Sequence, residues 1–341
     1  MRVATPFLKQ VAYGTGLLSL YHRHRNRRTL TVVMFHRVLA PTDPRFDNSP
    51  SEWTVTTSVF EGCLAFFKRH YNIVSLDDVL GAQAGGAPLP DFSLLVTFDD
   101  GYADNAEYAL PILRKYGFPA VLFVFSDGID RTRRPWQEDF YAAWMQGNVT
   151  TAELRATFQR LGGRLAVTDP DEMARDLVQR APVLSDQDAA ILFESLTRPL
   201  FVTRLPPQMV TSAQLRELQS NRVSIGAHGK THSAIPLCAA PEEELRVPRE
   251  VIAGALGTGD AASVSSMSFP HGLYTQEIVA MARREGYRLL FTSRECLVPT
   301  ENGRLTQSLL GRIHISGPHI APTGRLHSEL LALLLFTGAN T

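Results

Sequence analysis

The chain has 341 residues, of which 44% are hydrophobic and 20% are charged, and its formal net charge at pH 7 is zero. This length allows one large α/β domain or two smaller ones. A zero net charge provides no overall basic field toward nucleic acid, so we expect no nucleic-acid partner. Three widely spaced cysteines without a CxxC pair argue against a disulfide framework and against a cysteine zinc site.

Residues 1–30 form a basic N-terminal segment whose apolar stretch, residues 11–20, is too short to span a bilayer. Basic residues follow this stretch, whereas a secretory signal carries them first, so we expect no cleavable signal peptide and a cytoplasmic or membrane-associated protein. Two interpretations stay open: an amphipathic segment in peripheral contact with an anionic membrane, or a solvated helix packed on the domain. The basic residues are Arg23, Arg25, Arg27 and Arg28.

Short apolar runs then alternate with segments of helical periodicity. Strands are predicted at 31–35, 73–74, 94–98, 120–125, 223–227, 266–269, 289–292 and 312–315, and helices at 58–70, 106–115, 212–219, 242–255 and 276–285. This alternation indicates parallel strands joined by crossover helices. No GxGxxG turn follows an early strand, which favours a barrel over an open sheet.

Residues 130–208 interrupt this pattern, because they are rich in charged residues, Ala and Leu and contain few strand signals. We predict a catalytic barrel over 31–325 with this stretch as a helical insertion, and a C-terminal helix and tail over 326–341. Long loops on barrels are commonly functional. The insertion carries aromatic residues of the types that stack on sugars, although packing in its own core is the alternative. These residues are Trp136, Tyr141 and Trp144.

The most informative stretch is 94–102, where an apolar run ends in Asp99 and Asp100. Two adjacent carboxylates resist ionising together unless a cation or a proton lies between them. A metal bound by one carboxylate, with the other free as a base, would satisfy both. Further ligands are then expected at the ends of other predicted strands.

Two histidines, His228 and His232, follow the predicted strand 223–227 with the four-residue spacing that also occurs in zinc-binding helices. The flanking glycines, Gly226 and Gly229, favour a loop with a helical start over a continuous helix. An isolated HxxxH pattern is weak evidence of a metal site, but the position after a strand strengthens it.

Two other predicted strands also end in polar residues. Strand 31–35 is followed by His36, and strand 266–269 leads into Pro270-His271-Gly272. In a β/α barrel the C-terminal ends of the strands open onto one face, and that face carries catalysis. We therefore expect these residues to share one rim with the two aspartates and the two histidines.

Three segments, TFDDGYADN (97–105), GAHGKTH (226–232) and SFPHG (268–272), resemble the sequence blocks of the polysaccharide deacetylase family, the NodB-homology group or carbohydrate esterase family 4. The opening MFHRVL (34–39) resembles the YHRV start of many bacterial members. The resemblance implies an α/β fold, a distorted (β/α) barrel of the NodB type. It also implies a divalent metal, usually Zn²⁺, with Co²⁺ or Ni²⁺ as alternatives. It covers about residues 31–130 and 205–316 and leaves out the first thirty residues and most of the insertion.

The resemblance also implies roles for individual residues. By position, Asp99 matches the catalytic base of the family, and the metal ligands are matched by Asp100, His228 and His232. Contact with the substrate or with the oxyanion is expected at Tyr102, Pro270 and His271.

The sequence departs from the family in two places. Many members carry an arginine in the third block that orients the base, but no arginine adjoins Pro270, so this support has to come from elsewhere or be absent. Many members place the general-acid histidine in a late Leu-x-His block, which is not cleanly matched here. We predict His36 as the acid, as in members with an N-terminal histidine of the YHRV type, with His314 as the alternative. A buried histidine that only stabilises a strand end is the structural alternative for His36.

The implied function is metal-dependent removal of N-acetyl groups from a glycan that contains N-acetylhexosamine, such as an exopolysaccharide. One alternative is an amidase or O-deacetylase that acts on another substrate with the same barrel. The other is a catalytically weak carbohydrate-binding relative, which the missing arginine motivates and the intact Asp-Asp and His-x-x-x-His blocks oppose.

Overall fold

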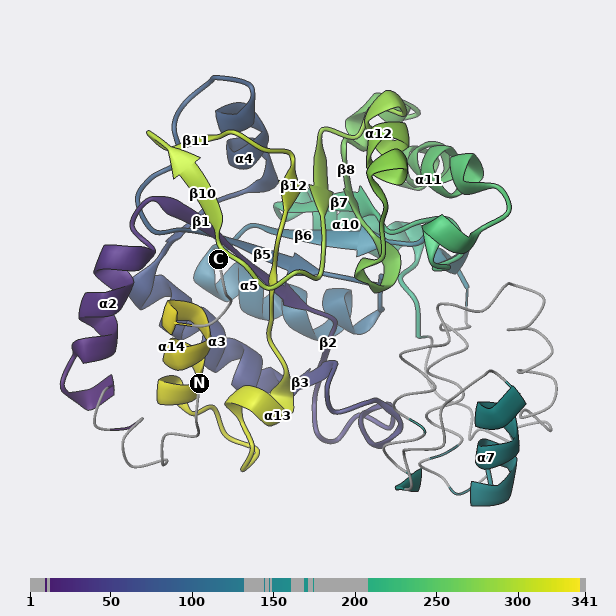
Figure 1. The fold of residues 1–341 in the computed structure, drawn as a ribbon, viewed down its shortest axis with the longest axis horizontal. Coiled ribbons are helices and arrows are strands. Elements are labelled where there is room, and N and C mark those ends of the chain that lie inside the picture. The colour runs from purple at the N-terminus through teal and green to yellow at the C-terminus, as the bar shows by residue number, and fades with distance from the viewer. Residues whose placement is uncertain are drawn as a thin grey trace.

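A curled parallel sheet forms the centre of the molecule, with helices packed around it (Figure 1). The computed structural model describes residues 10, 13–131, 144, 147, 149–160, 169–170, 174 and 208–337. Most of the predicted insertion, with Trp136 and Tyr141, lies outside the described residues, and Trp144 is helical and half-buried. The predicted domain limits stay predictions.

The sheet curls so that a segment near the C-terminal end returns to its first strand. Neighbouring strands are parallel along the order β1, β5, β6, β7, β8, β9 and β12. The short strand β13 (Ile313–His314) follows β12 and pairs with the remaining edge of β1. The curled sheet, with β13 beside β1 and helices on its outer side, confirms the expected distorted (β/α) barrel, although β12 and β13 are joined by the chain and not by strand pairing. The other strands are β1 (Thr29–Phe35), β5 (Ser93–Phe98), β6 (Ala120–Val124), β7 (Val223–Ala227), β8 (Ser266–Ser268), β9 (Leu289–Phe291) and β12 (Leu309–Leu310).

Several small strands extend this sheet at its margins. An antiparallel hairpin pairs with the start of β1, a two-residue strand pairs with β5, and two strands form a separate parallel pair. These are the hairpin β10 (Val298–Glu301) and β11 (Arg304–Leu305), the strand β4 (Asn72–Ile73), and the pair β2 (Arg37–Leu39) and β3 (Thr54–Thr56).

Helices such as α3 bury apolar faces against the outer side of the barrel. In α3, the N-cap Thr56 accepts a hydrogen bond from the N–H of Val59 at 3.2 Å, and Phe60, Leu64 and Phe67 are buried as their spacing predicts. The helices are α2 (Leu17–Arg25), α3 (Thr57–His70), α4 (Leu76–Gln83), α5 (Leu110–Tyr116), α7 (Thr151–Arg160), α10 (Ser212–Ser220), α11 (Pro241–Leu256), α12 (Gln276–Arg284), α13 (Gly317–Ile320) and α14 (Ser328–Thr337).

Two helix starts compare differently with their predictions: one is confirmed and the other begins in another conformation. The predicted capping box before α10 is present, because Thr211 and Gln214 each bond the backbone of the other. The helix predicted from residue 106 begins instead as a π-helical turn, Asn105–Ala109, and becomes α-helical at Leu110. Such turns are frequent at functional sites, and this one directly follows the Asp-Asp block.

The barrel interior is filled by side chains, so its functional groups are confined to the rim. Phe123 of β6 and Phe291 of β9 pack with their ring centroids 5.0 Å apart. On β7, a side chain at Gly226 would place its Cβ only 2.6 Å from the Phe123 ring, so this position has no room for one. Polar residues that follow the strands are therefore directed to the carboxyl-terminal rim of the barrel.

The first and last described helices pack against each other on one side of the barrel (Figure 1). Asn26, which follows α2, donates to the carbonyl of Leu335 in α14 at 2.9 Å, and His22 stacks on Phe336 with centroids 4.1 Å apart. Within the described part of the chain, none of the helices has the length and apolar character to cross a membrane.

Candidate active site and metal centre

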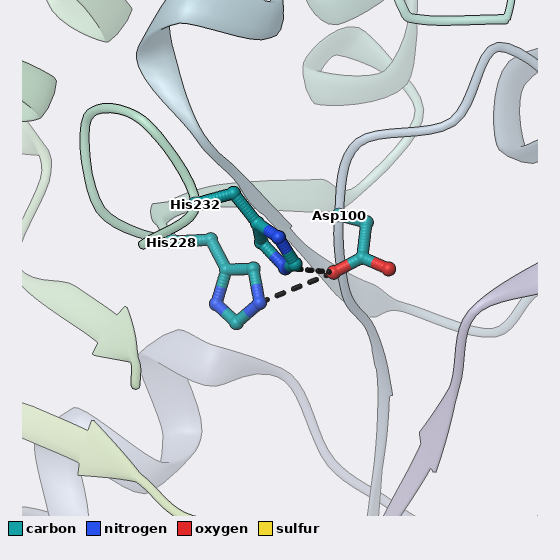
Figure 2. A group of neighbouring side chains, drawn as sticks. All are labelled: Asp100, His228 and His232. Carbon is teal, nitrogen blue, oxygen red and sulfur yellow. Dashed lines mark hydrogen bonds and ion pairs between the residues drawn. The ribbon is translucent and has the colours of Figure 1, made fainter. Parts of the chain in front are cut away.

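One carboxylate oxygen of Asp100 faces both predicted histidine ligands, which lie side by side (Figure 2). Its Oδ1 is 3.2 Å from Nε2 of His228 and 3.1 Å from Nε2 of His232. All three side chains are buried, and among the described residues they form the group of possible ligands whose donor atoms lie within 4.8 Å of one another. His228 and His232 lie in an irregular loop after β7, without the expected helical start.

This donor set fits a divalent metal such as zinc. Ligands at about 2.0–2.1 Å from a tetrahedral zinc are roughly 3.3 Å from one another, close to the separations seen here. One carboxylate and two imidazoles leave a fourth position for water or substrate, as catalytic sites require. Asp100 and His232 also have left-handed backbones, with φ angles of 74° and 64°.

Ser268, at the end of β8, orients His228. The carbonyl of Ser268 accepts a hydrogen bond from Nδ1 of His228 at 2.8 Å, which leaves Nε2 facing Asp100. Metal-binding histidines usually have such a partner on the second ring nitrogen, because it fixes both the tautomer and the ring plane.

Asp99 lies beside this group but has a different partner, Arg312. The guanidinium donates two parallel hydrogen bonds to the carboxylate, from Nη1 to Oδ1 at 2.7 Å and from Nη2 to Oδ2 at 2.6 Å. Nε of Arg312 donates to the carbonyl of Thr292 at 3.0 Å, and Ser268 Oγ lies 3.2 Å from Asp99 Oδ2. Arg312 is fully buried between β12 and β13, so both partners of this ion pair are held in place.

The electrostatics keep both carboxylates charged. Burial by itself favours a neutral carboxyl, but Arg312 and His228 outweigh it and hold the pKa of Asp99 below its usual range. For Asp100, burial is likewise outweighed, here by His232 and His228, and the pKa lies well below its usual value. Burial opposes a charge on His228, yet the two carboxylates raise its pKa.

Two further histidines, His36 and His314, lie at this rim with their ring centroids 5.2 Å apart. His36 follows β1 and stacks against Trp53 at 6.0 Å, while His314 ends β13. Burial lowers the pKa of His36, opposed by the negative charges of Asp100 and Asp99. Burial and the neighbouring His36 lower the pKa of His314 to about 3.

The remaining predicted site residues occupy different surroundings. His271 has a φ of 57°, its Nε2 lies 2.9 Å from the carbonyl of His232, and its ring is 4.6 Å from that of His232. Pro270 is buried in the same turn. Tyr102 is 1% exposed and lies under the guanidinium of Arg37, 4.4 Å from its ring centroid. Its predicted contact with substrate stays a prediction.

A comparison with protein families matches residues 86–290 to the family described as Polysaccharide deacetylase. The chain belongs to the polysaccharide deacetylase family. Among curated relatives, 102 residues are 28% identical to the poly-beta-1,6-N-acetyl-D-glucosamine N-deacetylase of Escherichia coli strain K12, covering 27% of this chain and 15% of that protein. The chain thus matches only a small part of that relative's length. A second relative, the putative polysaccharide deacetylase YxkH of Bacillus subtilis, is 50% identical over 36 residues, which cover 11% of this chain and 13% of that protein.

Solved structures of similar fold include two that span nearly the whole chain. IcaB from Ammonifex degensii aligns with a TM-score of 0.55 and 17% identity over 92% of this chain and 98% of its own. The Streptococcus pyogenes deacetylase PplD, in complex with acetate, aligns with a TM-score of 0.54 and 17% identity over 87% of this chain and 96% of its own. At this identity the likeness establishes the fold alone.

In this member of the deacetylase family, the partner of Asp99 is Arg312, which the sequence motifs do not specify. Its signal was present in the predicted strand 312–315, where alternation places Arg312 and His314 on one face and Ile313 and Ile315 on the other. Both isoleucines are in the core, so the two polar residues face the rim.

Proposed function

We propose that this protein is a metal-dependent hydrolase that removes N-acetyl groups from a polysaccharide containing N-acetylhexosamine. The observation that carries the proposal is the pair of adjacent carboxylates with different partners: Asp100 with two histidines, and Asp99 with Arg312. Family membership and the E. coli relative's printed name support the reaction and the substrate class.

Asp100, His228 and His232 would hold the metal. When bound, a divalent ion supplies a Lewis acid that lowers the pKa of a water molecule and polarises an acyl oxygen. Asp99 then accepts the proton of the attacking water, because it is charged and adjacent to the ligand Asp100. Arg312 fixes the direction of the Asp99 carboxylate and has no proton to give up at ordinary pH.

The departing amine requires a proton, which we assign to His36. Burial lowers the pKa of both histidines, but the negative charges of Asp100 and Asp99 oppose this shift at His36, whereas the pKa of His314 falls to about 3. His314 is the alternative proton donor.

The negative charge that develops on the acyl oxygen needs a hydrogen-bond donor, which we place in the turn after β8. Pro270 has no N–H, and Gly272 donates to the carbonyl of Phe269 at 3.0 Å, so we assign this contact to the N–H of His271.

The alternatives carry less support. The carbohydrate-binding hypothesis was motivated by a missing arginine, and Arg312 removes that motive. An amidase or O-deacetylase would use the same groups, so only the choice of substrate separates it from the proposal.

The test is acetate release from N-acetylglucosamine oligomers with β-1,6 and β-1,4 linkages, compared with small amides and O-acetyl esters. The protein is supplied with zinc, cobalt or nickel after chelation. We expect the wild type to release acetate from an oligomer only when metal is supplied. Both Asp99→Asn and Asp100→Asn should lose this activity, and Asp99→Asn should keep its metal. Release from esters or small amides alone would favour the alternative hydrolases, and metal binding without release would favour the binder.

We also propose a peripheral contact between α2 and an anionic membrane. Leu17, Leu20 and Tyr21 are 61%, 66% and 47% exposed and, at i, i+3 and i+4, share one helix face. Residues 1–42 contain no Asp or Glu, which suits an anionic surface. Sedimentation with neutral vesicles and with vesicles containing phosphatidylglycerol tests this contact. We expect the protein to bind the anionic vesicles selectively, and we expect the double variant Leu20→Ser/Tyr21→Ser to bind them more weakly. Equal binding by the double variant and the wild type would contradict the proposed contact.

A further inference from the structure

A buried carboxylate outside the predicted site contacts the backbone between the two histidine ligands. Glu244 lies in the first turns of α11 and is 5% exposed. Its Oε2 accepts hydrogen bonds from the N–H groups of Lys230 at 2.7 Å and Thr231 at 3.1 Å. Its Oε1 accepts from the hydroxyl of Thr231 at 2.8 Å. Of the three glutamates that open α11, this is the one that is buried.

The opposite side of the same loop is fixed by the turn η3 (Ser126–Gly128), which follows β6. The carbonyls of Gly229 and Lys230 accept from the N–H groups of Ser126 at 3.1 Å and of Asp127 at 2.9 Å. Gly229 has a φ of 76°, and a Cβ there would lie 3.1 Å from both Glu244 Oε2 and Pro270 Cγ. The loop is therefore held between η3 on one side and the Glu244 carboxylate on the other.

We propose that Glu244 is a positioning residue for the metal centre. Successive backbone N–H groups form a concave anion site, and the Glu244 carboxylate fills it from within the protein. Its charge-assisted hydrogen bonds fix the turn that separates His228 from His232 and stabilise the unfavourable φ of His232. Both imidazoles then present Nε2 to the same oxygen of Asp100. This inference rests on the proposed metal-dependent function.

The variant Glu244→Gln tests this role, because its amide has the same shape but one oxygen becomes an NH₂ group that cannot accept a hydrogen bond. Loss of a residue that orients ligands typically weakens metal affinity about 10- to 100-fold, and we expect a rise in the zinc Kd in that range. Competition with a chromophoric chelator measures the Kd. The matched control, Lys230→Ala, removes the ammonium group that pairs with Glu243 at 2.9 Å but keeps the N–H bonded to Glu244. We expect its Kd to stay within about twofold of the wild-type value.

The wild-type protein and Asp100→Asn serve as references, because they separate a failure of the proposed function from a failure of the positioning role. If the wild-type protein and Asp100→Asn bind zinc equally, the proposed function itself fails. If the wild type binds through Asp100 but Glu244→Gln binds as tightly as wild type, the positioning role is overturned, and a lower Tm of the metal-free variant would not rescue it. Should Glu244→Gln not fold, Thr231→Val removes one of the three donors; we expect a Kd increase of about threefold, and an unchanged Kd overturns the inference.

Discussion

Asp99 and Asp100 are neighbours in the chain, yet their side chains have different partners. Asp99 continues β5, with its N–H bonded to the carbonyl of Phe35 at 3.0 Å, and meets Arg312 inside the barrel mouth. Asp100 has a left-handed backbone, which turns its side chain toward the histidine loop. Two adjacent carboxylates therefore avoid direct competition, because each has its own positive or protonatable partner.

Arg312→Lys is expected to lower kcat by roughly 10- to 100-fold while the zinc Kd stays near the wild-type value. Lysine keeps the charge but cannot form the two parallel bonds that orient the Asp99 carboxylate. Steady-state kinetics on the preferred oligomer and a metal titration check this. Arg284→Lys, on the exposed side of α12, serves as the control. A loss of metal affinity as large as the loss of kcat would contradict the separation of base and ligands.

His36→Ala is expected to lower turnover of the N-acetylated oligomer by on the order of 100-fold, because an amine leaves poorly without a proton. The same variant should hydrolyse an acetate ester of an acidic phenol at close to the wild-type rate, since that leaving group needs no proton. His314→Ala is the matched comparison. The assignment of the acid moves to His314 if that variant, and not His36→Ala, shows the selective loss on the oligomer.

The residues that the sequence identified and those that it missed differ in a physical way. Asp100, His228 and His232 follow predicted strands in motifs with fixed spacing, so the rule for strand ends in a barrel was enough to place them together. Arg312 and Glu244 reach the site by side-chain contacts across about 213 and 14 positions of the chain, which no local pattern specifies. Alternation in 312–315 could have indicated the first of these, while Glu244 is one of three adjacent glutamates.

At the scale of elements, the small pair β2 and β3 is joined to the Asp-Asp block by a fully buried ion pair. Arg37 donates to Oδ2 of Asp104 from Nε at 2.9 Å and from Nη2 at 2.8 Å. The other oxygen of Asp104 accepts from the N–H of Val38 at 2.9 Å, and Asn105 donates to the carbonyl of His36 at 3.1 Å. The segment with the predicted acid is therefore fixed directly to the block that carries the predicted base.

Asp104→Asn is expected to destabilise the protein by about 3–5 kcal/mol, because it leaves the Arg37 charge buried without its counter-ion. Both side chains of this pair are 0% exposed, whereas those of Arg27 and Asp91 are 62% and 46% exposed. Asp91→Asn, the matched control, should cost less than about 1 kcal/mol. Urea unfolding of both variants at pH 7.5 gives the comparison. Equal small losses would show that the buried pair contributes no more than a surface pair.

The elements themselves were largely predictable where apolar periodicity was strong. The predicted strand 223–227 coincides with β7, and α3 and α12 differ from their predicted ranges by one residue. The hairpin β10–β11 and the short strands β2 and β3 were missed. Each has two to four residues and a mixed polar pattern, and is stabilised by neighbours distant in sequence.

At the scale of the whole molecule, the two ends of the described chain stabilise each other. The buried face of α2 meets α14 and the end of α3 through a cluster of rings, with Tyr71 and Phe92 also within 4.8 Å and 5.1 Å of the His22 ring. Nε2 of His22 lies 3.1 Å from the carbonyl of His70. Because this cluster encloses two histidines among apolar side chains, the packing of the ends depends on their neutral forms.

The protein is expected to lose stability as the pH falls from about 6.5 to about 4. Burial lowers the pKa of His70 to about 4 and also lowers that of His22, so the unfolded chain takes up these protons first. The stability that the neutral histidines contribute is therefore complete above their pKa in the unfolded chain, and it is lost as the pH falls toward their pKa in the folded protein.

His70→Asn should reduce this pH-dependent loss of stability by roughly 1–2 kcal/mol, with allowance for the partial exposure of the ring. Urea unfolding at pH 7.5 and 4.5 measures the loss, and His24→Asn, at an exposed position of α2, is the control. If the stability of the wild type and of His70→Asn falls by the same amount, His70 does not account for the pH sensitivity.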